Sequence, residues 1–246
     1  MLFSNSDLPE NSDPISSFSY HLENPPASLK GLREHYRPEQ LGLLEKLNRR
    51  DEPHLPRLQV LVVPNRWDLP ELDYSPMPKR YRWAEPHRKA LIVYLPGQVF
   101  GAYEWGQLVR WGPVSSGGVD RATPQGLFHL NWRSTGRRST VNPAWYMPWY
   151  FNFENREGLS LHAYTLPGYP ASHSCIRLLE RDARWLYDWG EPWELGERLW
   201  EVRQYGTPLL ILGQYDFHHP APWHALDWWA RGVQLPADPV FIFDAE

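Results

Sequence analysis

Short β-prone runs, each closed by Gly, Pro or polar turn residues, dominate the chain from residue 89 onward. KALIVYL, QVFGAYE and QLVRWGPV follow one another, and GLFHLNW and LSLHAY come later. Aromatic and β-branched residues favour extended backbone, and runs of this length between turn signals are typical of strands. The pattern therefore predicts a domain that is mainly β with some helix, an α+β fold class.

Two segments after this β-rich region have the apolar spacing of helices, and a last strand follows them. ERDARWLYDW and PWELGERLWEVRQYG are the predicted helices, and TPLLILGQ is the predicted buried strand. Residues 215–246 give mixed signals and are expected to form a C-terminal extension. The aligned apolar residues are Leu179, Ala183 and Leu186 in the first helix and Leu195, Leu199 and Val202 in the second.

A small unit precedes the β-rich region. Residues 18–64 read as strand, helix, helix, strand, in the segments FSYHLE, SLKGLREHY, PEQLGLLEKLNRR and LQVLVVP. Ser28 is a suitable N-cap for the first helix, and Pro38 is well placed as the first residue of the second. Residues 65–88 are Pro-rich and aperiodic, which predicts an extended linker, and residues 1–17 are expected to be a flexible polar lead.

Composition and charge narrow the classes of partner. The chain has 246 residues, a net charge of −4 and no block of basic residues, so we expect neither nucleic acid nor an anionic membrane surface as a partner. No apolar run reaches the roughly eighteen residues of a membrane span. The start lacks the basic and apolar regions of a signal peptide. The protein is therefore cytoplasmic, or its export signal lies outside this chain.

The single cysteine, Cys175, is the most informative reactive residue. It follows His173 by two residues, and His162 lies upstream in the predicted strand LSLHAY. A thiolate nucleophile needs a base or a positive environment. His162 is the candidate base, while His173, on the cysteine's own turn, could orient the loop or compete for the role of base. The N-terminus of a helix beginning near Leu178 would favour the thiolate. Backbone N–H groups around Ser174 are candidates to hold an oxyanion.

Other readings of these residues stay open on spacing alone. A lone cysteine is often a buried, inert apolar residue. A zinc site made of His162, His173 and Cys175 lacks a convincing fourth ligand. The segment HHPAPWH is a further metal-binding candidate, although a solvated or packed tail is the simpler interpretation; its histidines are His218, His219 and His224.

The segment LHAYTLPGYPASHSCIRL resembles the signature of the L,D-transpeptidase catalytic domain (YkuD type). That signature is a strand histidine followed by Ser/Thr-His-Gly-Cys, an apolar residue, and Asn or Arg. VSSGGVDRATPQGLFHL, RDARWLYDW and YGTPLLIL also resemble family segments, so the resemblance covers residues 89–214. The matching residues are His162, Ser172, His173, Cys175, Ile176 and Arg177.

The resemblance implies a β-sandwich or barrel with short helices and a cysteine acyltransferase that acts on bacterial peptidoglycan. His162 would deprotonate Cys175, which would form a thioester with a stem peptide at a third-position diamino acid. An amine acceptor would give a cross-link, whereas water would give carboxypeptidase or amidase activity. The resemblance implies no metal or organic cofactor, possible acylation by carbapenems, and a location in the cell envelope reached through an export signal outside this chain.

Substrate contacts and departures from the family complete the expectations for this domain. Arg177 is a candidate for holding a substrate carboxylate, or else it bonds loop carbonyls. Ser174 replaces the customary glycine, and Ala163 stands where many members have Gly or Ser; both favour an alternative, an inactive wall-binding protein. WYMPWYFNF is a candidate aromatic wall of the peptide groove, or else part of the core, through Tyr146, Trp149 and Phe151.

Residues 18–64 resemble the lysin motif (LysM), a small module that binds peptidoglycan and chitin. The resemblance rests on SLKGLREHY, LLEKLNR and LQVLVVP, whereas PPAS replaces the usual Gly-Asp-Thr before the first helix. The resemblance implies a βααβ module that binds glycan or serves as a spacer, and it predicts that this module is separable from the catalytic domain.

Overall fold

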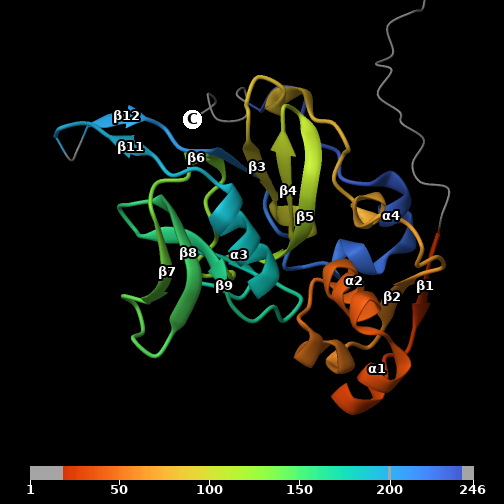
Figure 1. Ribbon diagram of the computed structural model, residues 1–246. Coiled ribbons are helices and arrows are strands. Elements are labelled where there is room, and N and C mark those ends of the chain that lie inside the picture. The colour runs from red at the N-terminus through yellow and green to blue at the C-terminus, as the bar shows by residue number, and fades with distance from the viewer. Residues whose placement is uncertain (1–18, 199–200, 240–246) are drawn as a thin grey trace, which may run out of the picture.

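The computed structural model describes residues 19–198 and 201–239 (Figure 1). Within them, nine strands form one central sheet in the order β6-β13-β3-β4-β5-β10-β9-β8-β7. The α+β class predicted from the sequence is confirmed. The strands are β3 (Ala90–Tyr94), β4 (Val99–Glu104), β5 (Gln107–Ser115), β6 (Gly126–His129), β7 (Arg133–Arg138), β8 (Tyr146–Glu154), β9 (Leu159–Ala163), β10 (Ile176–Leu178) and β13 (Pro208–Leu212).

The two ends of this sheet are consecutive parts of the chain, so the sheet curls round on itself. β6 pairs with β13 and β7 pairs with β8, and residues 130–132 join them. Leu130 N donates to Thr207 O at 2.9 Å, while Asn131 N donates to Asn152 O at 2.8 Å. The same short segment thus bonds to the residue before β13 and to β8, the neighbours of the two edge strands, and the sheet curls into a barrel-like shape.

The two faces of the sheet bury different apolar clusters, because side chains alternate along each strand. On β3, Leu91 and Val93 belong to the cluster inside the curled sheet, whereas Ile92 belongs to the cluster on the opposite face. Helix α3 (Glu180–Trp189) packs against β8 and β9 and adds Ala183 and Leu186 to the inner cluster. This helix agrees with the sequence prediction.

The N-terminal unit contains β1 (Tyr20–Glu23), α1 (Leu29–His35), α2 (Pro38–Asn48) and β2 (Leu61–Pro64). β1 and β2 pair antiparallel, so the predicted order of strand, helix, helix, strand is present. The Ser28 hydroxyl accepts a hydrogen bond from Gly31 N at 3.1 Å and caps α1 as predicted. A 3-10 helix (Glu52–Arg57) follows α2. The lead at residues 1–17 lies outside the described residues.

The outer face of the sheet is covered jointly by the N-terminal unit, the segment 65–88 and the C-terminal segment. The segment 65–88, expected to be an extended linker, contains 3-10 helices at Glu71–Tyr74 and Arg82–Ala84. A 3-10 turn (Pro222–His224) and α4 (Leu226–Arg231) lie in the C-terminal segment. One buried cluster draws on all of them, through Leu43, Leu47, Val62, Tyr74, Met77, Tyr81, Ile92, Trp111, Trp223, Trp228 and Trp229.

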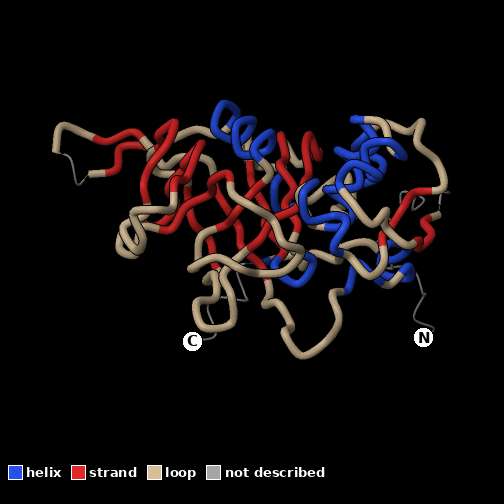
Figure 2. The backbone as a smooth tube through the Cα atoms, turned by 90° about the horizontal axis from the view of Figure 1, so that it is seen from below, coloured by secondary structure: helices blue, strands red, loops and turns tan. Residues whose placement is uncertain are grey.

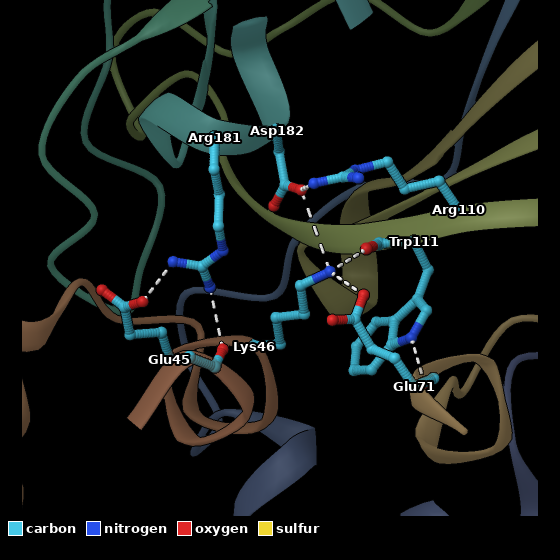
Figure 3. Close-up of polar contacts among 8 residues, drawn as sticks. Glu45, Lys46, Glu71, Arg110, Trp111, Arg181 and Asp182 are labelled. Atoms are coloured by element: carbon cyan, nitrogen blue, oxygen red, sulfur yellow. Dashed lines mark hydrogen bonds and ion pairs between the residues drawn. The ribbon is translucent and has the colours of Figure 1, made fainter. Parts of the chain in front are cut away.

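Buried charges also join the N-terminal unit to the sheet (Figure 3). Lys46 of α2 is 1% exposed, and its Nζ donates to Trp111 O at 2.7 Å and to Glu71 Oε1 at 2.6 Å. It lies 3.8 Å from Asp182 Oδ1, which also pairs with Arg110 at 2.6 Å. A buried ammonium needs such partners to offset its lost hydration.

The prediction of a helix over residues 192–206 is wrong. Within the described part of this segment, β11 (Glu194–Leu195) and β12 (Val202–Gln204) pair antiparallel, and Leu199 lies outside the described residues. Figures 1 and 2 show this hairpin reaching away from the body, at the opposite end from the N-terminal helices. A helix is stabilised mainly by packing its apolar face; here Leu195 and Val202 stay half-buried, and Gly196 weakens helix further.

Candidate active site

Two adjacent parallel strands bring the histidine and the cysteine of the signature together. In the register of β9 and β10, Arg177 lies opposite His162 and Ile176 lies opposite Leu161. Cys175 comes directly before β10 and therefore lies beside Ser160. Alternation places Ser160 and His162 on one face of β9. The folding of LSLHAY as a strand is thus what presents the imidazole to the thiol's side of the sheet.

His162 and Cys175 line one cavity. Cys175 is partly exposed with a free thiol, so the interpretation as a fully buried, inert cysteine does not fit. The cavity also receives side chains from β8, from the β7–β8 connection and from the turn before Cys175. Its lining includes Arg137, Val141, Trp145, Met147, Tyr150, Glu157, His162, Tyr164, Ser172, His173, Cys175 and Arg177.

The expectation that a helix N-terminus faces the thiol is wrong. α3 begins at Glu180, and strand β10 separates it from Cys175. The residues after the cysteine extend because they fill the gap between β5 and β9 in the sheet. The group that contacts Sγ is instead the hydroxyl of Ser160, whose Oγ lies 3.5 Å away. Ser160 is absent from the candidates that the sequence suggests.

His162 is 4% exposed, and its ring orientation is fixed by the backbone. Its Nδ1 donates to Ala163 O at 3.0 Å, which leaves Nε2 as the proton-accepting nitrogen. Because Ala163 supplies its carbonyl, no side-chain hydroxyl is needed at that position. Burial lowers the pKa of His162 to about 4, and the positive charge of Arg177 acts in the same direction. The imidazole is therefore neutral at pH 7.

The turn before Cys175 has a left-handed residue where the family has glycine. Ser174 has a φ of 70°, a conformation that costs a residue with a Cβ about 1 kcal/mol. Its Oγ donates to Arg121 O at 3.1 Å, and its carbonyl accepts from Thr123 Oγ1 at 2.9 Å. These bonds to the segment 114–130 offset the strain, so serine holds the turn here.

Ser172 and His173 complete the turn. The Ser172 hydroxyl donates to Cys175 O, and the Ser172 amide donates to Ser116 O at 3.0 Å. The His173 ring is exposed, and its centroid lies 4.9 Å from that of Trp145. Ser172 thus shapes the turn, while His173 forms part of the cavity's rim.

The guanidinium of Arg177 lies over the ring of Tyr164, 4.6 Å from its centroid. Burial lowers its pKa, but the residue remains a cation at pH 7. Among the described residues it has no hydrogen bond or ion pair, so the alternative in which it bonds loop carbonyls does not fit. Its charge faces the cavity and is available to an anionic ligand.

The predicted aromatic wall is not assembled as expected. Tyr146 lines a second groove beside α3, Trp149 packs edge-on against Tyr187 with centroids 5.6 Å apart, and Phe151 is in the inner core. The cause is a left-handed residue within β8: Trp149 has a φ of 55°. The alternation of side chains shifts there, so the cavity receives Trp145, Met147 and Tyr150 instead.

No group of three or more His, Cys, Asp or Glu residues in the described chain is arranged to hold a metal. His219 pairs with Asp216 at 2.6 Å, whereas His224 packs edge-on against Trp223. The described residues also contain no helix with the length and apolar character required to cross a bilayer.

The site thus combines a buried histidine and a partly exposed cysteine on adjacent strands of a curled sheet. Residues 88–211, half of the chain, match the family of the L,D-transpeptidase catalytic domain, YkuD. The chain belongs to this family. A comparison with curated proteins found no match.

Several solved structures are similar to this chain. L,D-transpeptidase (Yku) from Stackebrandtia nassauensis aligns with a TM-score of 0.42 and 22% identity, over 52% of this chain and 56% of that one. An L,D-transpeptidase from Mycobacterium smegmatis gives 0.41 and 17%, over 51% and 59%. L,D-transpeptidase 3 from Mycobacterium tuberculosis, in complex with a faropenem-derived adduct, gives 0.39 and 16%, over 51% and 60%. This chain thus spans less than two thirds of each.

Proposed function

We propose that the protein is a peptidoglycan L,D-transpeptidase with Cys175 as nucleophile and His162 as general base. The observation that carries the proposal is the shared cavity of a partly exposed thiol and a buried, neutral imidazole. A neutral imidazole accepts a proton, which a base must do before the thiol attacks. Membership of the L,D-transpeptidase family supplies the reaction class.

In the proposed reaction, His162 Nε2 takes the thiol proton while Sγ attacks the carbonyl between a third-position diamino acid and D-Ala. The C–N bond breaks, the leaving amine of D-Ala takes the proton from the imidazolium, and a thioester remains on Cys175. An amine of a second stem peptide attacks this thioester, gives its proton to His162, and forms the cross-link. The turn at Ser172–Cys175 is the proposed holder of the oxyanion.

Arg177 is the proposed anchor of the donor peptide. Its guanidinium faces the cavity without a hydrogen-bonding partner among the described residues, and a carboxylate on the diamino acid offers it two parallel hydrogen bonds. Because Tyr164 holds the guanidinium from one side, little side-chain freedom is lost on binding. Tyr146 and Trp149, in contrast, are not proposed to touch the peptide in this cavity.

The deciding experiment uses a disaccharide tetrapeptide and the full chain, with Cys175→Ala as the matched control. We expect mass spectrometry to show a cross-linked dimer lighter than two monomers by one D-Ala, formed by the native chain alone. Full turnover by Cys175→Ala would refute the proposal. Tripeptide without dimer would assign the protein to the hydrolytic alternative, and no reaction with any acceptor would favour a wall-binding protein.

Carbapenem acylation is a second readout of the same site. The strained lactam is an acyl donor that needs no acceptor peptide, so it tests Cys175 and the turn alone. We expect the native chain to gain the mass of the intact drug on the peptide that contains Cys175. A thiol that is alkylated readily but is not acylated by the drug would show that Cys175 is accessible while the oxyanion turn is not functional.

The proposed substrate places the reaction in the bacterial cell envelope, with an export signal supplied outside this chain.

The sequence of the N-terminal unit resembles a lysin motif, and the binding of glycan by this unit is a proposal. Since this unit shares a buried cluster with the catalytic sheet, the test is a substitution on its surface rather than its excision. Leu22→Asp on β1, where Leu22 is 42% exposed, should weaken co-sedimentation with insoluble peptidoglycan while leaving acylation unchanged.

A further inference from the structure

The buried hydroxyl of Ser160 has one hydrogen-bonding partner in the described structure, the sulfur of Cys175. Ser160 is completely buried on β9, and its Oγ donates to Sγ over 3.5 Å. A buried hydroxyl without a partner is costly, so its hydrogen is directed at the sulfur. A neutral thiol is a weak acceptor, whereas a thiolate is a strong one. The contact is therefore stronger once the proton has left Cys175.

The register of the strands explains why this contact is fixed. Ile176 pairs with Leu161, and the residues just before them, Cys175 and Ser160, are neighbours on one face. Both β9 and β10 lie inside the nine-stranded sheet. Ser160 is not part of the cavity lining. The sulfur thus has the substrate cavity on one side and a hydroxyl donor on the protein side.

We propose that Ser160 is a further catalytic residue, which donates a hydrogen bond to the Cys175 thiolate and stabilises it for attack. The inference rests on the proposed function only in taking Cys175 as the nucleophile. No covalent bond to Ser160 forms: its hydroxyl keeps its proton throughout, while the thiol proton goes to His162. When the thioester is resolved, the same hydroxyl receives the departing thiolate.

The other groups around Cys175 leave a role for a hydroxyl donor in stabilising the thiolate. α3 begins too far along the chain to supply a helix N-terminus. His162 is neutral at pH 7 and does not provide a resident positive charge. Arg177 supplies charge from the same face, and a fixed, dry hydroxyl adds a directed bond to it. Besides Cys175 itself, the charged and titratable groups that line the cavity are Arg137, Tyr150, Glu157, His162, Tyr164, His173 and Arg177.

The test compares the isosteric pair Ser160→Thr and Ser160→Val in the full chain. They have the same shape and differ by the hydroxyl, so packing changes are common to both. The rate of alkylation of Cys175 by iodoacetamide is measured against pH, with Ser134→Ala as a control hydroxyl on β7 outside the cavity. Circular dichroism and melting temperature show whether each variant is folded.

We expect Ser160→Thr and Ser134→Ala to keep the native pH profile. Ser160→Val should move the midpoint upward by about one pH unit, which is an approximately tenfold loss of rate below the midpoint. Its high-pH plateau, where the thiol is fully ionised, should not fall. Coincident profiles for Thr and Val, or an equal loss at every pH, would overturn the inference. If neither β-branched variant folds, Ser160→Ala and Ser160→Gly against the native chain give the same comparison.

Alkylation requires no cell-wall substrate, so this result is independent of the proposed function. A shifted profile with no reaction on muropeptides would keep the role of Ser160 toward the thiolate and refute the transpeptidase proposal. Muropeptide turnover with an unshifted profile would support the transpeptidase proposal and refute the role of Ser160.

Discussion

Arg177 is paired with His162 in the parallel register of β10 and β9, so a cation lies beside the buried imidazole on the same wall of the cavity. Burial is the main reason that the pKa of His162 falls to about 4, and this cation adds to it. The imidazole is therefore free of its proton at neutral pH, and a positive charge lies beside it in the cavity. The pH dependence of the reaction should therefore change when either residue is substituted.

The fall of the acylation rate at acidic pH, called the acidic limb here, should reflect the protonation of His162. Acylation requires the neutral imidazole, so the rate should fall as the pH drops through about 4, well below the ordinary value for histidine. His162→Gln should slow acylation by roughly two to four orders of magnitude and remove this limb. His173→Gln, whose ring is exposed at the rim, should keep it. An acidic limb that follows His173 and survives loss of His162 would show that the base is misassigned.

Folding stability should change with pH through the same residue. In the unfolded chain the imidazole takes up a proton near pH 6.5, whereas in the folded chain it resists until about pH 4. Protonation therefore favours unfolding, and stability present above pH 6.5 should be lost as the pH falls toward 4, by about 3 kcal/mol in total. Urea titrations at pH 7, 5.5 and 4.5 measure this loss, which His162→Gln should reduce. Equal slopes for both chains would contradict the buried neutral state.

Changing Arg177 should separate substrate binding from proton transfer. Arg177→Gln removes a positive charge from beside the imidazole, so the acidic limb should move to higher pH, and loss of the carboxylate partner should raise KM about tenfold or more. Arg177→Lys keeps the charge without the planar fork. It should therefore retain the native limb while still raising KM. A limb that moves equally in both variants would show that shape, and not charge, sets the titration.

Much of this site follows from the sequence because its parts are local. The strand with His162, the turn with Cys175 and the helix α3 each have short-range signals of alternation, turn residues and apolar spacing. The sequence pattern did not indicate a role for Ser160, because polar residues that alternate with leucines, as in LSLHAY, normally face solvent. Here the polar face of β9 is buried and is turned toward Cys175.

Long-range packing accounts for the features that local patterns missed. The left-handed backbone at Trp149 shifts the alternation of the side chains that follow it in β8, and no residue type in WYMPWYFNF predicts it. In the segment 192–206 the helical spacing of the apolar residues did not predict the structure, since β11 and β12 pair as a hairpin in which Leu195 and Val202 are only half-buried. The shared core of the N-terminal unit joins residues nearly two hundred positions apart, as between Leu43 and Trp229.

The left-handed turn residue provides a test of local strain. Ser174→Gly relieves the positive φ but loses the bond from Oγ to Arg121 O, so the two effects should nearly cancel in unfolding free energy. Ser174→Ala keeps the strain and loses the bond, and should destabilise the protein by about 1 kcal/mol. Chemical denaturation measures both. If alanine proved as stable as glycine, the backbone at this turn would not be strained by a side chain.

The buried charge of Lys46 should decide whether the N-terminal unit and the catalytic sheet unfold together. Lys46→Met keeps the length and apolar stem but removes the donor to the carbonyl of Trp111 and the cation beside the fully buried carboxylate of Asp182. We expect a loss of about 3 kcal/mol or more, with one transition that also removes acylation. Lys30→Met is the matched control: its side chain is 86% exposed and pairs with Glu34 at 3.7 Å, so the change in unfolding free energy should stay within about 0.5 kcal/mol.

Deleting residues 1–64 should leave Ile92 and Trp111 uncovered and give an aggregating chain. A soluble, cooperatively folding deletion variant that still acylates would show that the unit is a separable module after all.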